Sequence, residues 1–424
     1  MPKRILYYKI KSFFYPYILI KKIYPYYERY FLPFQQTLLP LPPEDIPKNF
    51  WKFGIEDLIC FITMAFSTLS IWLAVGLYGS LKSVVKYWDG PNYVYAAITL
   101  YEIPYDNPWF RYFQYKPSYF ACHLPGFPII IRFFSFFTCG NYEIADYLAI
   151  LFCSLLLSYS FRRLLIAYNC VQNPTFSTQI LSIFPLRLAI YHSVGASEPL
   201  FMSFSCLALV FYKFDYYNQL LFAIWGACFT RIEGMAVGFT MGVCFLLSFR
   251  IKKAFGMFLT FLSTFALLAF HLAMFGDAFA YIHFNSNFQH LIVWPPFPEL
   301  SHFQSTNVVY MHSFLNFYLP LTIGTFSLYS IAAPPAIFST TFLIYLSLLR
   351  HVDIFRYSLS SAIFAYIVGF DGFFSHPIVK KVISYLWPVY FIMVLLYCSG
   401  QINSNNCPDE FWRLVMDASL DKIH

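Results

Sequence analysis

Long apolar runs recur along almost the whole of this 424-residue chain. A helix needs about 20 apolar residues to cross the roughly 30 Å hydrocarbon core of a bilayer, and several runs are that long. Only 12% of the residues are charged, whereas soluble domains carry about 25%. This excludes a water-facing globule, and the sequence lacks the alternating ten-residue segments of a transmembrane barrel. We therefore predict an all-α polytopic membrane protein.

Apolar length and periodicity predict about eleven transmembrane helices within a membrane domain at 53–399. The expected spans are 58–79, 143–161, 175–194, 197–213, 219–231, 235–249, 254–275, 313–331, 333–349, 357–372 and 382–399. The piece at 123–138 is also apolar, but it is short and is interrupted by Pro125, Pro128 and Arg132. We interpret it as a juxtamembrane or re-entrant helix.

The two ends of the chain differ in character from this domain. Residues 1–52 form a basic, aromatic-rich arm, which we expect on the cytoplasmic side against anionic headgroups. Much of the net charge of +7 comes from this arm, so it indicates membrane contact, and we expect no nucleic-acid binding. Residues 400–424 are expected to form a polar tail. With the N-terminus inside, the positive-inside rule places two large loops outside, at about 80–142 and 276–312.

This topology leaves some basic residues on the outer side, against the positive-inside rule: Lys116, Arg350 and Arg356. Binding an anion would explain such exceptions. Arg356 is followed by Tyr357 at the start of an expected span. This pair is either an interfacial anchor whose arginine snorkels to the headgroups or a clamp for a phosphate.

The segment Trp88-Asp89-Gly90 comes just after the first expected span. Ionisable residues in or at the rim of a membrane are costly and by default indicate a functional site. Asp89 can be the cap of a helix that begins near Pro91. Alternatively, it is a general base among aromatic side chains, where we expect desolvation to raise its basicity.

Three further segments with charged residues lie near the expected outer ends of spans. The segment 230–234 interrupts an apolar run and is predicted to be a turn, in which Arg231 either pairs with Glu233 or faces a polar substrate. Glu198 fits ordinary chemistry of a helix start, and it also falls on the outer face. Asp277 ends a span, as part of either a polar turn or a substrate contact.

Taken in order, these motifs resemble those of the GPI mannosyltransferase II family and its bacterial relatives. The resemblance covers about 55–375, with two departures: Leu124 stands where the family often has Phe, and Glu233 is an unusual charge in its turn. The residues that carry it are Trp88-Asp89-Gly90 with Tyr93, His123-Leu124-Pro125-Gly126-Phe127-Pro128, Ser193 to Phe201, Thr230-Arg231 with Gly234, Gly276-Asp277-Ala278-Phe279 and Arg356-Tyr357.

The resemblance implies a GT-C glycosyltransferase bundle. Such enzymes transfer a sugar from a polyprenyl-phosphate donor to a lipid-linked or membrane-bound acceptor. Asp89 would then be the base of an inverting transfer. The leaving phosphate would need cations, for which Lys116, Arg231, Arg350 and Arg356 are the candidates. His123, Glu198, Glu233, Asp277 and Tyr357 are further candidates for substrate binding, and we expect neither a divalent metal nor a cofactor.

Two other classes of protein stay open. One is a transporter or flippase of an anionic lipid, and the other is a non-catalytic membrane subunit related to the family. The candidate charges cluster at the outer rim, whereas transporters usually bind near the midplane, so the enzyme is favoured. The sequence has no Asn-x-Ser/Thr acceptor and has bacterial-like segments, which favours a bacterial inner membrane. In a eukaryote we would expect the endoplasmic reticulum membrane.

Overall fold

The computed structural model describes residues 34, 37–288, 296, 317–349 and 353–418. Within these residues every regular element is a helix, and Tyr87 and Asn406 form an isolated bridge. This confirms the predicted all-α class. Most of the basic arm at 1–52 and the site candidate Arg350 lie outside the described residues.

Among the described residues, four helices are long and apolar enough to cross a membrane. They are α4 (Ile55–Tyr78), α8 (Tyr142–Tyr168), the run Ile251–Phe275 and α23 (Pro377–Ser404). At about 1.5 Å per residue each is at least 35 Å long, which exceeds the hydrocarbon thickness of about 30 Å. Membrane-crossing helices were expected at all four places. The third run is made of α14 (Ile251–Gly256), η5 (Met257–Thr260) and α15 (Phe261–Phe275).

Shorter helices occupy most of the other expected spans. They are α11 (Glu198–Lys213), α12 (Tyr217–Thr230), α13 (Gly234–Leu247), α19 (Leu319–Leu328), α20 (Ala333–Ser347), α21 (Ile354–Ala362), the π-helix η7 (Ile363–Val368) and α22 (Asp371–Phe374). A helix of 14 to 16 residues reaches only about 24 Å or less. Four described helices are thus each long enough to cross a membrane, and the total of about eleven spans stays a prediction.

The expected span at 175–194 is wrong, because the chain forms two short helices there. α9 (Pro174–Leu181) and α10 (Leu186–Tyr191) are separated by a break before Pro185. Proline has no amide hydrogen and disfavours helix in the residue before it, so a continuous helix cannot pass this point easily. Consequently Arg187 lies in the first turn of α10.

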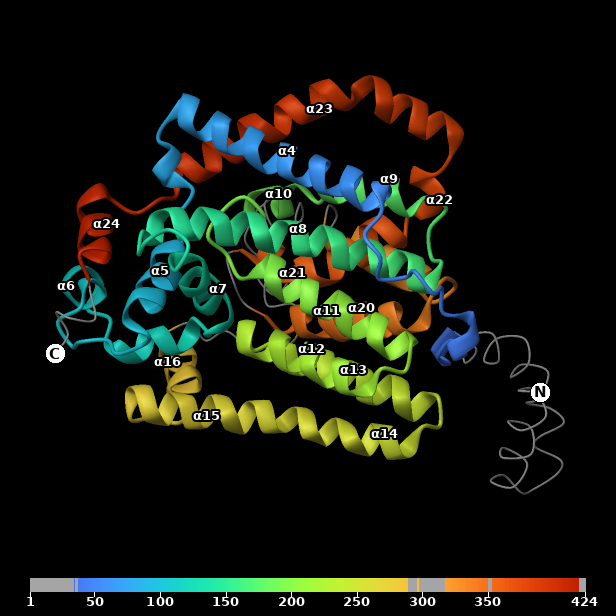
Figure 1. Cartoon of the computed structure of the whole chain (residues 1–424), viewed down its shortest axis with the longest axis horizontal. Coiled ribbons are helices and arrows are strands. Elements are labelled where there is room, and N and C mark those ends of the chain that lie inside the picture. Colours follow the sequence, from blue (N-terminus) through green and yellow to red (C-terminus); the bar gives the residue numbers. More distant parts are fainter. Residues whose placement is uncertain (1–33, 35–36, 289–295, 297–316, 350–352, 419–424) are drawn as a thin grey trace, which may run out of the picture.

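Long helices lie along two opposite edges of the molecule. α4 and α23 run side by side along one edge in Figure 1, and α14 and α15 run along the opposite edge. Between them α8 packs against α4, α7 and α11, and α11 packs in turn against α12. In Figure 1, α11, α12, α13 (Gly234–Leu247) and α21 (Ile354–Ala362) lie between these two edges.

The first loop, 80–142, folds into short helices. These are η3 (Leu81–Ser83), α5 (Gly90–Thr99), α6 (Pro108–Phe113), η4 (Pro117–Cys122) and α7 (Gly126–Ser135). α7 has 10 residues and is about 15 Å long, too short to cross a bilayer. It therefore agrees with the juxtamembrane interpretation of 123–138. In Figure 1, α5, α6, α7 and α16 (Ala280–Phe288) gather at one end of the molecule.

Several basic residues gather at the other end of the molecule. Arg162 and Arg163, near the end of α8, share the buried Asp57 of α4 at 2.7 and 2.6 Å. Arg250, just before α14, pairs with Asp215 at 2.9 Å. The start of α4 and α14 lie away from α5 in Figure 1. The short helix η2 (Pro43–Asp45) precedes α4 in the chain.

The segment after α23 is more than the polar tail that we expected. Its helix α24 (Asp409–Met416) buries Phe411 and Trp412. The ring of Phe411 packs edge-on against Trp109 of α6 at 4.8 Å between centroids. This apolar contact anchors the end of the chain on the first loop.

Candidate functional site

Asp89 occupies the residue before α5, but its carboxylate makes no helix-capping hydrogen bond. Oδ2 lies 2.7 Å from Nη1 of Arg356, and Oδ1 lies 3.6 Å from Nε2 of His123. The side chain is 25% exposed. The carboxylate is thus held by a cation from a distant part of the chain. The alternative in which Asp89 only caps a helix does not describe this contact.

Arg356 links Asp89 to a second carboxylate, because its Nε donates to Oε1 of the buried Glu198. The same oxygen accepts a hydrogen bond from Nη1 of Arg231 at 2.5 Å, and Nη2 of Arg231 lies 3.0 Å from Oε1 of Glu233. We call these five residues the charged cluster. They form one continuous chain of ion pairs, and they come from four separate segments of the sequence.

Helix starts and turns position the members of the charged cluster. Glu198 is the first residue of α11, where a negative charge is favoured by the positive end of the helix dipole. Arg231 and Glu233 lie in the turn between α12 and α13, as the sequence predicted. Arg356 is in the first turn of α21. Side chains at these places can converge without interrupting the helices that carry them.

The electrostatic surroundings of Asp89 differ from our expectation. Burial alone would raise the pKa of this carboxyl, but the charge of Arg356 and the hydrogen bond and charge of His123 outweigh it and hold the pKa well below its usual range. The expectation that desolvation would raise the basicity of Asp89 is therefore wrong for this state of the protein. While it is paired with Arg356, Asp89 is ionised and is a weak base.

His123 is fixed beside Asp89 by neighbouring polar groups. Nδ2 of Asn92 lies 2.9 Å from Nε2 of His123 and 3.1 Å from the hydroxyl of Tyr119. The hydroxyl of Tyr101 donates to the carbonyl oxygen of His123. These contacts place the motif residue His123 at the same site as the motif residue Asp89.

The end of the chain fixes the backbone just before Asp89. The amide of Trp88 donates to the carbonyl of Asn405 at 3.2 Å, and the amide of Cys407 donates to the carbonyl of Lys86 at 3.0 Å. The buried ammonium of Lys86 also lies 2.7 Å from Asp409. Sequence reasoning missed this contact, because nothing local relates residues more than 300 positions apart.

Gly90 is required by a close approach of the backbone. A Cβ atom placed on Gly90 would fall 2.4 Å from the carbonyl oxygen of Val85 and 3.6 Å from that of Gly195. The first distance is far below any real carbon–oxygen contact. The glycine of the Trp-Asp-Gly motif therefore allows the turn that directs Asp89 toward Arg356.

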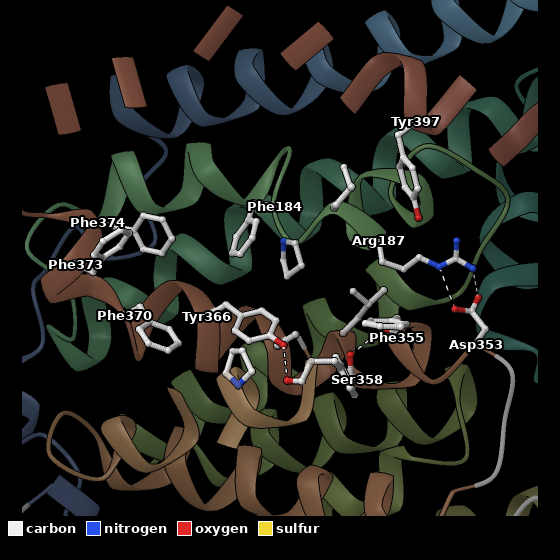
Figure 2. A pocket seen from close by; sticks show the side chains of 16 residues that line it. Phe184, Arg187, Asp353, Phe355, Ser358, Tyr366, Phe370, Phe373, Phe374 and Tyr397 are labelled. Atoms are coloured by element: carbon white, nitrogen blue, oxygen red, sulfur yellow. Dashed lines mark hydrogen bonds and ion pairs between the residues drawn. The ribbon is translucent and has the colours of Figure 1, made fainter. Parts of the chain in front are cut away.

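A second ion pair lies next to the charged cluster, and sequence analysis missed it. Nε of Arg187 lies 3.1 Å from Oδ1 of Asp353, and a second bond from Nη2 to Oδ2 makes the pair bidentate (Figure 2). The hydroxyl of Tyr191 donates to Oδ2 of Asp353 at 2.8 Å. Arg187 could have been noticed, because it is a charge inside a run that was taken as a membrane span.

Aromatic rings connect the cations. The ring centroid of Tyr191 lies 5.0 Å from Cζ of Arg356 and 5.4 Å from Cζ of Arg187. The ring of Tyr357 lies 5.5 Å from Cζ of Arg231. These are cation–π distances, and two guanidinium groups thus lie against one tyrosine ring. Tyr357 joins the site in this way, as a neighbour of Arg231.

Two candidates are not brought to the charged cluster. Lys116 is exposed at the start of η4. Asp277 lies between α15 and α16, where it pairs with His283 at 2.7 Å and accepts the amide of Phe279 at 2.9 Å. Among the described residues no ion pair joins either side chain to the cluster. The polar-turn interpretation of Asp277 therefore describes its contacts.

Two buried polar atoms in the site have no hydrogen-bond partner among the described residues. They are Oε2 of Glu198 and Nδ1 of His123. A buried polar atom without a partner is costly, so such atoms need an explanation. A hydroxyl group of a polar ligand would satisfy either atom.

Comparison with known families and with curated proteins finds no match for this chain. Within the described residues, no group of three His, Cys, Asp or Glu side chains is arranged to hold a metal ion.

Proposed function

We propose that this protein is a membrane glycosyltransferase of the GT-C type, with mannosyltransferase-like motifs. It would transfer a sugar, with inversion, from a polyprenyl-phosphate donor to a lipid-linked or membrane-bound acceptor. One observation carries the proposal: Asp89, Glu198, Arg231 and Arg356 come from four separate motifs of the resemblance and meet in one charged cluster. Independent surface charges would have no reason to converge in this way.

The proposed reaction assigns a role to each charge. The acceptor hydroxyl gives its proton to Asp89 while its oxygen forms a bond to the anomeric carbon. The bond between that carbon and the phosphate oxygen breaks, and its electron pair leaves with the phosphate. Arg356 and Arg231 stabilise the charge that develops on the phosphate.

The charge balance of the cluster adds a requirement. Three carboxylates share two guanidinium groups, so the cluster carries a formal charge of −1 before any substrate binds. A donor phosphate must therefore compete with Asp89 and Glu198 for Arg356. When the phosphate takes Arg356, Asp89 loses the contact that lowers its pKa and becomes a stronger base. Donor binding would in this way prepare the base for the acceptor.

The unpaired oxygen of Glu198 supports a role in sugar recognition. A buried carboxylate oxygen accepts a hydrogen bond strongly, and a sugar presents several hydroxyl donors. Glu198 would then orient the sugar, while its other oxygen holds both arginines. Nδ1 of His123, the ring nitrogen that does not face Asp89, is a second buried polar atom that a substrate hydroxyl can satisfy.

The direct test is a transfer assay with the purified full-length chain in lipid nanodiscs. The probes are radiolabelled polyprenyl-phosphate mannose and a lipid extract that supplies acceptors. We expect a labelled lipid product that does not form with nucleotide-linked mannose. If no labelled product forms from any polyprenyl-phosphate sugar, the proposed function is wrong. Lipids that accumulate in a deletion strain would identify the acceptor and would decide between a bacterial inner membrane and the endoplasmic reticulum.

A transporter or flippase of an anionic glycolipid is the second candidate. It is favoured by a cavity of about 760 Å³ that is lined in part by Arg187 and Asp353. Such a protein would move a lipid without breaking a bond. Movement of a fluorescent glycolipid across liposomes that contain the protein, without any transfer product, would support this candidate.

A further inference from the structure

The turn that carries Asp89 has an unusual residue at its second position. The amide of Gly90 donates to the carbonyl of Tyr87 at 2.8 Å, so residues 87–90 form a β-turn. Trp88 has a φ of 40°, and Asp89 has a φ of −83° and a ψ of −9°. A positive φ followed by a negative one is typical of a type II′ turn, whose second position usually holds glycine. Trp88 therefore has a left-handed backbone conformation that is costly for a residue with a bulky side chain.

The side chain of Trp88 does not explain why this conformation persists, because the residue is 58% exposed. The backbone beside it is instead held by the end of the chain. The amide of Trp88 donates to the carbonyl of Asn405 at 3.2 Å, and the amide of Cys407 donates to the carbonyl of Lys86 at 3.0 Å. A strained residue persists only where the surrounding structure fixes it. These two hydrogen bonds provide such a constraint.

We call residues 403–412 the C-terminal strap. An ion pair also attaches it to the turn, because Nζ of Lys86 lies 2.7 Å from Oδ1 of Asp409. The lysine side chain is 5% exposed and the aspartate side chain 78%. The hydrogen bond and the charge of Lys86 lower the pKa of Asp409, so this carboxyl is ionised at neutral pH. A buried ammonium without a partner is costly, and Lys86 therefore favours the position in which the strap lies against the turn.

The C-terminal strap is fixed on both sides of this ion pair. Before it, the amide of Ser80 donates to Oδ1 of Asn403 at 3.4 Å, and Nδ2 of Asn403 donates to the carbonyl of Val75 at 3.1 Å. After it, the ring of Phe411 packs against Trp109 of α6. The strap is thus attached at the end of α4 and at α6, and the residues between these two attachments contact the turn.

We propose that the C-terminal strap positions Asp89 for the proposed reaction, with Lys86 and Asp409 as the pair that keeps Trp88 in its left-handed conformation. Asp89 directly follows Trp88, so relaxation of Trp88 would turn the carboxylate away from Arg356. Lys86 and Asp409 are positioning residues, which act through the backbone of the turn. The role of Asp89 rests on the proposed function, whereas the contact between strap and turn does not.

Amide hydrogen exchange of the full-length protein in lipid nanodiscs tests the contact without any substrate. Lys86→Met removes the buried ammonium and keeps the length of the side chain. The matched control is Lys82→Met, which removes an exposed ammonium 3.5 Å from Glu143 in the same loop. We expect the amides of Trp88 and Cys407 to exchange about tenfold faster or more in Lys86→Met, and at close to the wild-type rate in Lys82→Met. Equal exchange in the two variants would overturn the proposal.

Asp409→Asn breaks the same ion pair from its exposed side, and it serves as the test if Lys86→Met does not fold. Its effect should depend on the residue at the strained position, because glycine adopts a positive φ at little cost. We expect Asp409→Asn to lower kcat of transfer about tenfold or more in the otherwise unaltered protein. In a Trp88→Gly background the same substitution should lower kcat much less. Equal losses in the two backgrounds would show that the strap does not act through Trp88.

The kinetic pattern separates positioning from a general loss of stability. A displaced base slows the chemical step, so Lys86→Met should lower kcat per folded molecule without raising KM for the donor. A loss that is explained entirely by a smaller folded fraction would contradict the proposal.

The two kinds of measurement also distinguish this inference from the proposed function. If the wild type transfers no sugar, the proposed function is wrong, and hydrogen exchange still shows whether the ion pair holds the turn. If the wild type transfers sugar, and Lys86→Met exchanges faster at Trp88 with an unchanged kcat, only the positioning role is wrong.

Discussion

Arg356 holds Asp89 in an ion pair of 2.7 Å and at the same time binds Glu198 through a different nitrogen. The arginine thus stands between two carboxylates, one of them almost completely buried. Like charges at such close quarters repel each other strongly unless a cation compensates them. Arg356 is therefore important for stability as well as for the proposed chemistry.

Removing the charge of Arg356 should destabilise the protein. We expect Arg356→Gln to lower the free energy of unfolding by roughly 3 kcal/mol, because breaking a buried pair leaves carboxylates without compensation. Thermal unfolding in detergent, followed by tryptophan fluorescence, measures the effect. The double variant Arg356→Gln/Asp89→Asn should lose less than the sum of the two single variants, because the residues are in contact. Additive losses would show that the ion pair contributes little.

A substitution that keeps the positive charge of Arg356 but removes its planar guanidinium distinguishes a phosphate clamp from a membrane anchor. Lysine cannot bind two carboxylates through separate nitrogens of a planar group, so we expect Arg356→Lys to raise KM for the donor about tenfold or more. An interfacial anchor would tolerate lysine, whose flexible ammonium reaches headgroups equally well. Unchanged dependence on donor concentration would assign Arg356 to anchoring and leave Arg231 as the phosphate candidate.

The pH dependence reports the low pKa of Asp89. A carboxyl whose pKa is lower in the folded than in the unfolded protein stabilises the fold at pH values above its unfolded pKa of about 3.9. This stabilisation is lost as the pH falls through the folded pKa. The same low pKa keeps Asp89 of the wild type ionised between about pH 5 and 8. Asp89 should therefore cause no acidic limb in the pH profile of kcat/KM over this range. In Arg356→Gln the pKa should rise, because burial is no longer outweighed, and the limb should move to higher pH.

His123 is the neighbouring group that could imitate this effect, since it lies 3.6 Å from Asp89. The pH profile of Arg356→Gln is therefore repeated with His123→Asn. A limb that belongs to Asp89 persists in the double variant, whereas a limb that belongs to His123 disappears. Profiles of Arg356→Gln and the wild type that coincide would contradict the assigned cause of the low pKa.

Gly90 should not accept even one methyl group. We expect Gly90→Ala to cost roughly 2 kcal/mol, the middle of the usual range for overpacking, because the added carbon would meet the backbone of Val85. The matched control is Gly400→Ala in α23, where an added Cβ has open space. Thermal unfolding compares the two variants. Equal stability would mean that the turn before α5 can relax without loss.

Much of the architecture could be predicted from hydrophobic length alone. Runs such as 58–79 and 382–399 are long enough to be helices wherever they pack, and α4 and α23 lie there. The run at 175–194 is also long and apolar, so it was predicted to be one span. That prediction was wrong because the helix breaks before Pro185. Local pattern also predicted the turn at Arg231 and the helix start at Glu198.

The partners within the site could not be predicted in the same way. The motifs indicated Asp89 and Arg356 as separate candidates, but their pairing depends on how α5 and α21 pack. Asp353 was missed because it pairs across 166 positions with Arg187. The direction of the pKa shift of Asp89 was also missed, since burial and a nearby cation act in opposite directions and only the geometry decides between them.

The measurement that tests the proposed mechanism most directly is transfer by Asp89→Asn, with carrier binding measured in the same preparation. Asparagine keeps the size of the side chain and loses its basicity, so we predict a fall in the transfer rate of about 10²–10⁴-fold, while polyprenyl phosphate still binds. Arg111→Gln, which breaks an exposed ion pair with Asp106, is the control and should transfer at the wild-type rate. Transfer by Asp89→Asn at close to the wild-type rate would show that Asp89 is not the base.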